Sequence, residues 1–344
     1  METISGNLKE QYAPLKEQKV RIREAAKQLG VSEVELLVLG CGENVTRLRP
    51  EFEAILGKIE SLGYVMALSR NDEVVHERKG IYQNASFGPH ASLFVGKDID
   101  LRIFLGAWDS AFAVNELNGD KPRYSLQFFA KDGMALHKIY LESKSDLDAY
   151  HALVSEFTHE DQGQIQEVIR KEYTPENELS DAEIDVEGFR AAWEGLKDTH
   201  EFFGMLRTFK VTRTQALRLA PNTHYASKIS NAGLRQALTL AAADQTPIMV
   251  FVGNPGIIQI HSGAVKNIVD HGPWINVLDP LFNLHLKEAG IAESWVVRKP
   301  TEDGIVTSLE LFNERKELIC TLFGERKPGI PELEAWRNIA AQLN

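Results

Sequence analysis

An internal duplication is the feature of this chain that most constrains its fold. Residues 65–80 align with residues 248–263 at an offset of 183, and the same offset aligns residues 124–140 with residues 307–323. Offsets of 180 and 186 extend the match to the first and last helices of each copy. A pattern of about 130 residues therefore occurs twice. The duplication predicts two similar halves that pack together, with a ligand where they meet.

The size and composition of the chain are those of a globular protein with two domains. It has 344 residues, of which 43% are hydrophobic and 25% charged. The net charge of −11 argues against a nucleic-acid or anionic-membrane partner. No apolar run is long enough to cross a bilayer, and the polar N-terminus is not a secretory signal. With only Cys41 and Cys320, we expect no disulfide framework and a reducing cytoplasm.

Each copy begins with helices, continues as an antiparallel meander of short strands and closes with a helix, which is an α+β order. In the first copy we expect helices over 8–30 and 50–63 and a closing helix over 146–157. Residues 159–187 hold ten acidic residues against two basic ones, a composition typical of an exposed linker. The predicted organisation is an N-terminal repeat (1–157), an acidic linker (158–188) and a C-terminal repeat (189–344).

His200 lies in a segment whose apolar residues have helical spacing, which places it on, or at the edge of, an apolar stripe. The Asp198-x-x-Glu201 spacing could instead cap a fresh helix just before His200. The aligned residue of the first copy is Val20. A core or hydrogen-bonded histidine is the ordinary interpretation, and a ligand or catalytic role is the alternative.

Arg102 shows the converse difference between the copies. Strand alternation places Asp100, Arg102 and Phe104 on one face, and the best local match in the second copy sets Asn276 against Arg102. An exposed arginine paired with Asp100 is the ordinary interpretation. Because one copy keeps the histidine and the other keeps the arginine, we favour one composite site built from both halves.

Such a pair suits haem chemistry. A neutral imidazole is a good ligand for iron, and a guanidinium on the opposite side could donate hydrogen bonds to an iron-bound oxygen. Aromatic side chains near each residue would suit the faces of a macrocycle: Phe104, Phe202 and Phe203. Basic residues late in the second copy could neutralise carboxylates at its rim: Arg298, Lys299, Arg326 and Lys327.

Three motifs, DTHEFFGML, DIDLRIFL and ESWVVRKPTEDGIVTSLELF, together with the duplication, resemble the bacterial haemin-degrading factors of the HemS/ChuS/PhuS type. These are cytoplasmic haem-utilisation proteins of Gram-negative bacteria that serve iron acquisition. The resemblance covers essentially the whole chain. It implies two similar halves, each with a curved antiparallel sheet and flanking helices, and one haem b in a cleft between helix and sheet.

The resemblance also assigns roles to individual residues. It implies that His200 is the proximal axial ligand of the haem iron and that Arg102, with Phe104 beside it, faces the distal side. It implies that Lys299 and Arg326 approach the propionates. Family members often have a tyrosine where this chain has Phe323, so one hydroxyl contact to a propionate is missing at that end of the pocket.

Other histidines are secondary candidates. His76, whose counterpart is Gln259, is the alternative haem-iron contact, against an ordinary strand histidine. His224 follows Pro221-Asn222 in a loop and could serve as a transient ligand. The remaining candidates sit in β patterns that favour local hydrogen bonds: His137, His261 and His285.

Absent motifs narrow the chemistry further. The sequence has no GxGxxG after a strand, no P-loop, no HExxH, no CxxCH and no GxSxG. No built-in nucleotide site is therefore visible. Electrons for redox chemistry would have to come from an electron-donor protein or a soluble reductant.

Two functions follow from the resemblance. The first is haem-oxygenase-like ring opening, in which O2 reacts on the Arg102 side and iron is released. The alternative is a carrier that takes haem from an inner-membrane importer and passes it to a separate haem oxygenase. The neighbours of His200 are Thr199 and Glu201 rather than spare histidines, which favours degradation, whereas His76 and His224 keep transfer open.

Overall fold

The computed structural model describes residues 2–170, 172–175, 177–327 and 329–344. The chain divides into two compact units. Unit 1 comprises Met1–Arg70, Glu77–Glu172 and Asn254–Gln259, and unit 2 comprises Asn71–His76, Tyr173–Gly253 and Ile260–Asn344. Each unit thus contains one short segment that comes from the other sequence repeat.

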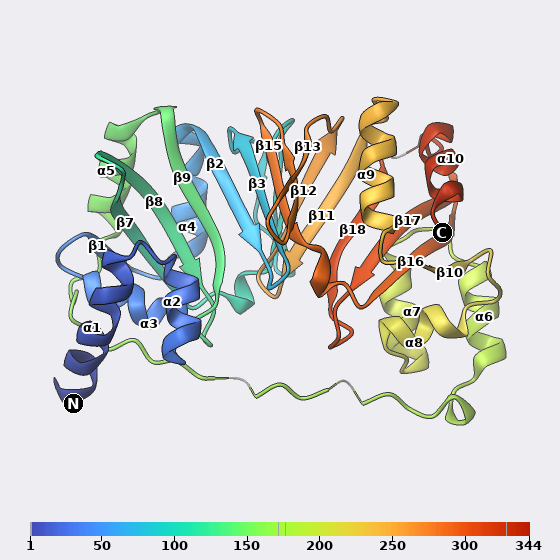
Figure 1. Ribbon diagram of the computed structural model, residues 1–344, viewed down its shortest axis with the longest axis horizontal. Helices are drawn as coiled ribbons and strands as arrows, with labels where there is room; N and C mark the ends of the chain where they lie inside the picture. Colours follow the sequence, from blue (N-terminus) through green and yellow to red (C-terminus); the bar gives the residue numbers. More distant parts are fainter. Residues whose placement is uncertain (1, 171, 176, 328) are drawn as a thin grey trace. The chain divides into compact units, whose positions relative to one another are not determined.

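Unit 1 begins with three helices that pack on one another around Ala25, Ala26 and Leu36 (Figure 1). The predicted single helix over 8–30 is divided, because Lys19 takes a left-handed conformation with φ 56° between the first two helices. A capping box between Ser32 and Glu35 starts the third helix. These helices are α1 (Glu2–Glu17), α2 (Ile22–Leu29) and α3 (Glu33–Leu37).

The sheet of unit 1 is antiparallel, with strand order β1-β7-β8-β9-β2 followed by residues 77–80 of β3. Its strands are β1 (Val45–Leu48), β2 (Gly63–Arg70), β3 (Val74–Gly80), β7 (Ser110–Asn118), β8 (Lys121–Phe129) and β9 (Ala135–Ser145). A second group has the order β12-β6-β5-β4, to which β12 (Ile257–Gly263) contributes its residues 257–259. The other strands of this group are β4 (Ala85–Ser86), β5 (Ser92–Val95) and β6 (Asp100–Ile103). The predicted meander is confirmed. The remaining helices are α4 (Phe52–Gly57) and α5 (Leu147–Phe157), the latter capped by Asp146.

Unit 2 repeats the arrangement. Its main sheet has the order β10-β16-β17-β18-β11-β12, and residues 74–76 of β3 begin the order β3-β15-β14-β13. The strands are β10 (Ala226–Ile229), β11 (Ile248–Asn254), β12 (Ile257–Gly263), β13 (Ile268–His271), β14 (Trp274–Leu278), β15 (Phe282–Lys287), β16 (Glu293–Thr301), β17 (Gly304–Phe312) and β18 (Leu318–Gly324). The helices are α6 (Val186–Glu194), α7 (Glu201–Phe209), α8 (Arg213–Leu219), α9 (Gly233–Ala243) and α10 (Glu334–Gln342). The predicted α+β duplication is confirmed.

Helices cover both faces of the main sheet of unit 2. Alternate residues of the central strands, Val250, Leu309 and Leu322, are buried together with apolar residues of α9 and α10. On the opposite face, Val297 and Phe312 are buried with α6, α7 and α8, which lie beside β16 (Figure 1). The first helices of the repeat therefore pack on the sheet face opposite to the closing helix.

The first part of the predicted acidic linker is tied to unit 1. Thr158 bridges to Leu48, and the buried Arg47 donates from Nη1 to Gln166 at 2.8 Å and from Nη2 to the carbonyl of Gln164 at 3.0 Å. The boundary between the units falls between residues 172 and 173, inside the predicted linker.

Candidate functional site

The helix that follows His200 starts afresh at Glu201. Glu201 Oε2 accepts hydrogen bonds from the backbone N–H groups of Lys197, at 2.8 Å, and Asp198, at 3.2 Å. Asp198 Oδ1 accepts from the backbone N–H of His200 at 2.7 Å. The two carboxylates thus satisfy three backbone donors just before the helix start, and the contact from Asp198 N–H to Glu201 is one half of a capping box. Of the two sequence-based alternatives, the fresh helix is confirmed and the apolar-stripe placement of His200 is wrong.

The imidazole of His200 points to solvent and is already oriented. Its side chain is 92% exposed, and its Nδ1 lies 2.6 Å from Asp198 Oδ1. An ionised carboxylate accepts hydrogen bonds only, so Nδ1 carries the proton in the neutral ring and Nε2 keeps its lone pair. The hydrogen bonds from His200 and the positive charge of Arg326 lower the pKa of Asp198. His200 is therefore an accessible nitrogen donor.

Aromatic side chains follow His200 along α7. Phe202 is buried with its ring 4.8 Å from that of Trp193, whereas Phe203 is 56% exposed. Lys299 Nζ lies 4.4 Å from the ring centroid of Phe202. The guanidinium of Arg213 lies 5.2 Å from that of Phe203. Phe202 and Phe203, which follow His200 within one helical turn, therefore each have a cation near the ring.

A fully buried carboxylate, Glu310 on β17, holds both of these cations. Its Oε1 accepts from Lys299 Nζ and its Oε2 from Arg213 Nε, each at 2.8 Å, and Ser308 Oγ donates to Oε1 at 3.1 Å. Burial alone would raise the pKa of Glu310, but attraction to Arg213 and Lys299 holds it well below its usual range. Burial lowers the pKa of Lys299. Arg213 remains 18% exposed, so it is the more accessible cation.

The next strands extend an apolar surface on the same sheet face. Ser308 pairs with Phe323 on β18, which pairs with Met249 on β11, so these side chains share a face. The rings of Phe323 and Phe251 are 5.1 Å apart in an edge-to-face contact. Met249, Phe251 and Phe323 are all partly exposed. This face of unit 2 therefore offers a flat apolar ligand a surface beside α7.

The two predicted propionate contacts, Arg326 and Lys299, differ in burial and in their partners. Arg326 is half-buried and close enough to Asp198 to lower the pKa of that carboxyl group. Lys299 is buried and paired with Glu310. Arg326 thus lies near Asp198, the carboxylate partner of His200, whereas the ammonium group of Lys299 is already paired with Glu310 inside the protein.

Arg102 belongs to unit 1, where it forms an ion pair with Asp100 and keeps 34% of its side chain exposed. Alternation is as predicted, because Leu101 and Ile103 are buried. Phe104 ends the strand and donates its backbone N–H to the carbonyl of Gly256 at 2.9 Å. His200 belongs to unit 2. The composite site that joins Arg102 and His200 stays a prediction.

The other predicted histidines have different surroundings. His76 is fully buried, with its ring 5.0 Å from that of Phe282, and His261 stacks on the same ring at 3.7 Å. His285 Nδ1 lies 2.6 Å from Asn276 Oδ1, which is a local hydrogen bond of the predicted kind. His224 is exposed in a loop of unit 2. A buried His76 would have to leave its aromatic neighbour to reach a haem iron.

His137 is held between two hydroxyl groups in unit 1. Ser69 Oγ lies 2.8 Å from Nδ1 and Tyr82 Oη lies 2.6 Å from Nε2. All three side chains are buried. Burial lowers the pKa of His137 to about 3, so the ring stays neutral.

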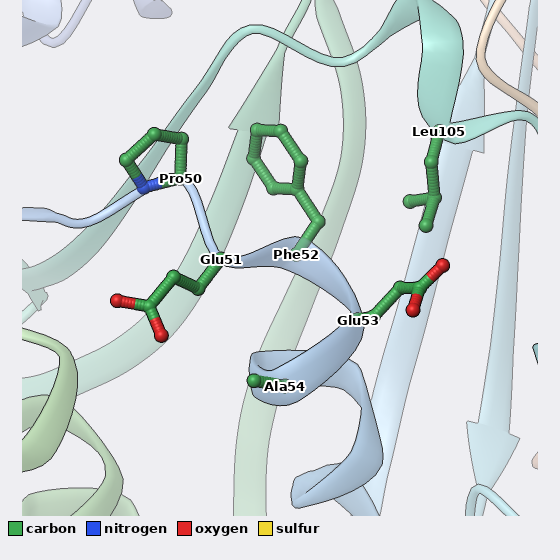
Figure 2. Close-up of a pocket in the computed structure, with 6 residues that line it drawn as sticks. All are labelled: Pro50, Glu51, Phe52, Glu53, Ala54 and Leu105. Carbon is green, nitrogen blue, oxygen red and sulfur yellow. The ribbon is translucent and has the colours of Figure 1, made fainter.

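Unit 1 has a hollow of about 410 Å³, and Figure 2 shows the residues that line it. Phe52 and Leu105 face it, and the carboxylates of Glu51 and Glu53 lie at its edge. Glu51 pairs with Arg49, and an edge that carries two carboxylates does not suit a ligand with carboxylates of its own. The exposed imidazole and the partly exposed apolar sheet face both belong to unit 2, where we place the candidate site.

Sequence reasoning missed two residues of this site, Glu310 and Arg213. Along TSLELF the glutamate alternates with leucines, a pattern typical of a strand with one solvated face. Burial of that face by α7 and α8 is a tertiary feature. The repeat offset of 180 offers one signal, because it sets Arg213 against Glu33, an opposite charge at an equivalent helix position.

Among the described residues, no helix is both long and apolar enough to cross a membrane. A model of the haemin-degrading HemS/ChuX domain matches residues 30–157 and again residues 210–343. The chain is 39% identical to the hemin transport protein HemS of Yersinia enterocolitica over 324 residues, which cover 94% of this chain and 92% of that protein.

Solved structures agree with this match. Holo-PhuS, a heme-binding protein from Pseudomonas aeruginosa, is 43% identical and covers 99% of each chain with a TM-score of 0.95. ChuS, described as an E. coli heme oxygenase, is 36% identical, with a TM-score of 0.88 over 98% of this chain and 99% of that chain. The matched segments span more than half of the sequence, and the chain therefore belongs to the haemin-degrading HemS/ChuX family.

Proposed function

We propose that unit 2 binds haem with His200 Nε2 as the axial ligand of the iron. The observation that carries this proposal is the exposed imidazole whose Nδ1 is bonded to Asp198, beside an apolar sheet face. Haem-iron sites in proteins commonly use a neutral imidazole whose other nitrogen donates to a carboxylate or carbonyl. The heme-binding function of PhuS, the structural relative at 43% identity, supports the assignment.

The surroundings of His200 fit the rest of a haem molecule. Phe203 on α7 and Phe323, Met249 and Phe251 on the sheet offer partly exposed apolar area for the macrocycle. Arg326 is the basic side chain that we expect at the propionates. Lys299 is buried against Glu310 and would contribute mainly through its positive charge.

We propose further that the protein opens the haem ring and releases iron, because ChuS, a relative that covers nearly the whole chain, is described as a heme oxygenase. His200 would hold the haem in place, and Arg102 would act on the distal side. The electrons would come from an external reductant, with O2 as the oxidant.

A carrier is the second candidate, and one observation favours it. His200 is 92% exposed, and an exposed ligand can be exchanged for that of a partner without moving the fold. The relatives named as hemin transport protein and heme-binding protein agree with this role. In this case the protein would receive haem from an inner-membrane importer and deliver it to a separate haem oxygenase.

One spectrophotometric experiment separates the two functions. The protein is loaded with one equivalent of haemin, a reductant is added with catalase present, and the Soret band is followed while products are identified by mass spectrometry. Loss of the band with a defined tetrapyrrole and released iron is expected for the enzyme. Catalase removes free peroxide, which bleaches haem without enzymatic help. A stable band, with transfer to an added haem oxygenase, would contradict degradation and establish the carrier.

A further inference from the structure

The carboxylate of Asp198 accepts two hydrogen bonds from the candidate iron ligand, one from the backbone N–H of His200 and one from its ring. We infer that Asp198 is a positioning residue that fixes the tautomer of His200 and makes its imidazole a stronger donor to iron. This inference rests on the proposed function. It adds a residue that decides the electronic character of the bound haem rather than its location.

The first step of the argument is geometric. One oxygen, Asp198 Oδ1, lies 2.7 Å from the backbone nitrogen of His200 and 2.6 Å from its Nδ1. The backbone contact fixes the oxygen relative to the chain, and the same oxygen then fixes the ring. Because the carboxylate can only accept, the proton is placed on Nδ1 and the lone pair on Nε2.

The second step is that the carboxylate is itself held before any ligand arrives. Glu201 Oε2 accepts from the backbone N–H of Asp198 at 3.2 Å and from that of Lys197 at 2.8 Å. The backbone that carries the carboxylate is therefore held in place, which is the kind of support that lets a carboxylate orient an imidazole donor.

The chemical consequence follows from charge. A hydrogen bond from Nδ1–H to a carboxylate raises the basicity of the ring, and a more basic axial ligand stabilises ferric over ferrous iron. Loss of such a partner lowers metal affinity by roughly ten- to a hundredfold in other metal sites. A neutral amide in place of the carboxylate keeps the size of the side chain and removes its charge.

The test compares Asp198→Asn with Asp185→Asn. Asp185 is a matched control, because it is an exposed aspartate of the same unit that caps α6 by accepting from the backbone N–H of Gly188 at 2.9 Å. Three quantities are measured on the full chain with haemin: affinity by Soret titration, reduction potential by spectroelectrochemistry, and the iron–imidazole stretching frequency of the ferrous form by resonance Raman spectroscopy.

For Asp198→Asn we expect about tenfold weaker binding of ferric haemin or more, a more positive reduction potential and a lower stretching frequency. Asp185→Asn should leave all three unchanged. Equal values in wild type and Asp198→Asn, or equal changes in both variants, would overturn the inference while the proposed function stands. If His200→Ala leaves the wild-type Soret band unaltered, the proposed function falls, and this inference falls with it.

Discussion

The two units attach their first helices to the sheet with the same kind of buried ion cluster, but with the charges exchanged. In unit 1 the carboxylate is Glu33 on helix α3, and it binds Lys138 and Arg70 on the sheet. In unit 2 the carboxylate is Glu310 on the sheet, and one of its two cations is Arg213 on helix α8. Each cluster has one carboxylate and two cations.

The exchange of charges is visible position by position. Glu33 and Arg213 occupy equivalent helix positions, 180 residues apart, and Gln127 occupies the position of Glu310, 183 residues earlier. Gln127 still bonds to the neighbouring serine, with Nε2 3.0 Å from Ser125 Oγ. Both copies of the fold therefore have a buried ion cluster between helix and sheet, although different residues form it in each copy.

The two units also differ in the exposure of the sheet face on which we propose that haem binds. In unit 1 the sheet positions equivalent to Met249 and Phe323 are Met66 and Tyr140, and both are buried. The guanidinium of Arg123 covers the ring of Tyr140 at 3.8 Å. In unit 2 the same face is partly exposed. One copy has closed this face and the other has left it accessible beside His200.

Removal of a cluster carboxylate should produce the largest effect. Glu310→Gln and Glu33→Gln each leave one buried lysine and one partly buried arginine without their anion, and we expect a loss of about 3–5 kcal/mol in the free energy of unfolding. Urea denaturation followed by tryptophan fluorescence measures it. Glu156→Gln removes a surface pair with Lys58 instead and should cost less than about 1 kcal/mol. Losses equal to this control would show that the clusters do not hold the helices.

His200→Ala should separate binding from stability. We expect haemin affinity to fall by about a hundredfold, because the iron loses its axial ligand. The free energy of unfolding should change by less than about 0.5 kcal/mol, since the side chain is exposed. Soret titration and urea denaturation measure the two quantities. His271→Ala, which changes an exposed histidine of the same unit, is the control, and an equal loss of affinity there would remove the special role of His200.

The units should also differ in their response to acid. The folded-state pKa of His137 is lowered to about 3 by burial, so the unfolded chain takes up a proton below its ordinary value near 6.5 and the native state does not. The contribution of His137 to the free energy of unfolding is fully present above about pH 6.5. It falls by up to about 1.4 kcal/mol per pH unit as the pH is lowered towards 3. Below about pH 4.5 both units lose further stability, because the pKa of Glu33 is lowered to about 2 and that of Glu310 is also held well below its usual range.

Hydrogen exchange measured from pH 7 to pH 4 tests this difference. Protection of β8 and β9 should fall before that of β17 and β18, because the position equivalent to His137 in unit 2 is Cys320, a buried thiol that gains no proton in acid. In the His137→Gln variant, the protection of β8 and β9 should depend less steeply on pH. Parallel loss of protection in both units would contradict the assignment.

Arg102→Ala should have the smallest effect. We expect haemin binding within a factor of about two and turnover slowed severalfold, because a distal guanidinium acts after the haem is bound. Arg49→Ala is a matched control, since Arg49 is a similarly exposed arginine of unit 1 that pairs with an acid two residues away. Turnover in Arg102→Ala equal to that of this control would leave Arg102 with a structural role only.

Much of the fold could be predicted because apolar and polar residues alternate along the strands of each repeat. In β6, Leu101 and Ile103 are buried and Arg102 is not, as the sequence pattern requires. The helix break at Lys19 could not be predicted, because a left-handed lysine has no local sequence signal. The sequence singles out His200 but does not predict its exposure. The helical spacing of apolar residues continues across Gly195, where the structure ends one helix before the next begins.

The candidate site was predictable where a residue has a distinctive type. His200 stands out because the aligned residue of the first copy is Val20, whereas the role of Arg326 came from the resemblance to the family. Glu310 does not stand out, because a glutamate that alternates with leucine is common in strands with a solvated face. Its burial depends on α7 and α8, and such tertiary packing overrides what a single strand can indicate.

The short segments that the repeats exchange bear on how the protein is made. Unit 1 is completed by residues 254–259, where the carbonyl of Gly256 accepts from the backbone of Phe104 and from Trp108 Nε1, each at 2.9 Å. A ribosome must therefore synthesise three quarters of the chain before the first unit can close. Until then the strand edge that these residues cover stays unpaired. If the two repeats were expressed as separate chains, each would lack a strand segment, and its open edge could pair with another molecule.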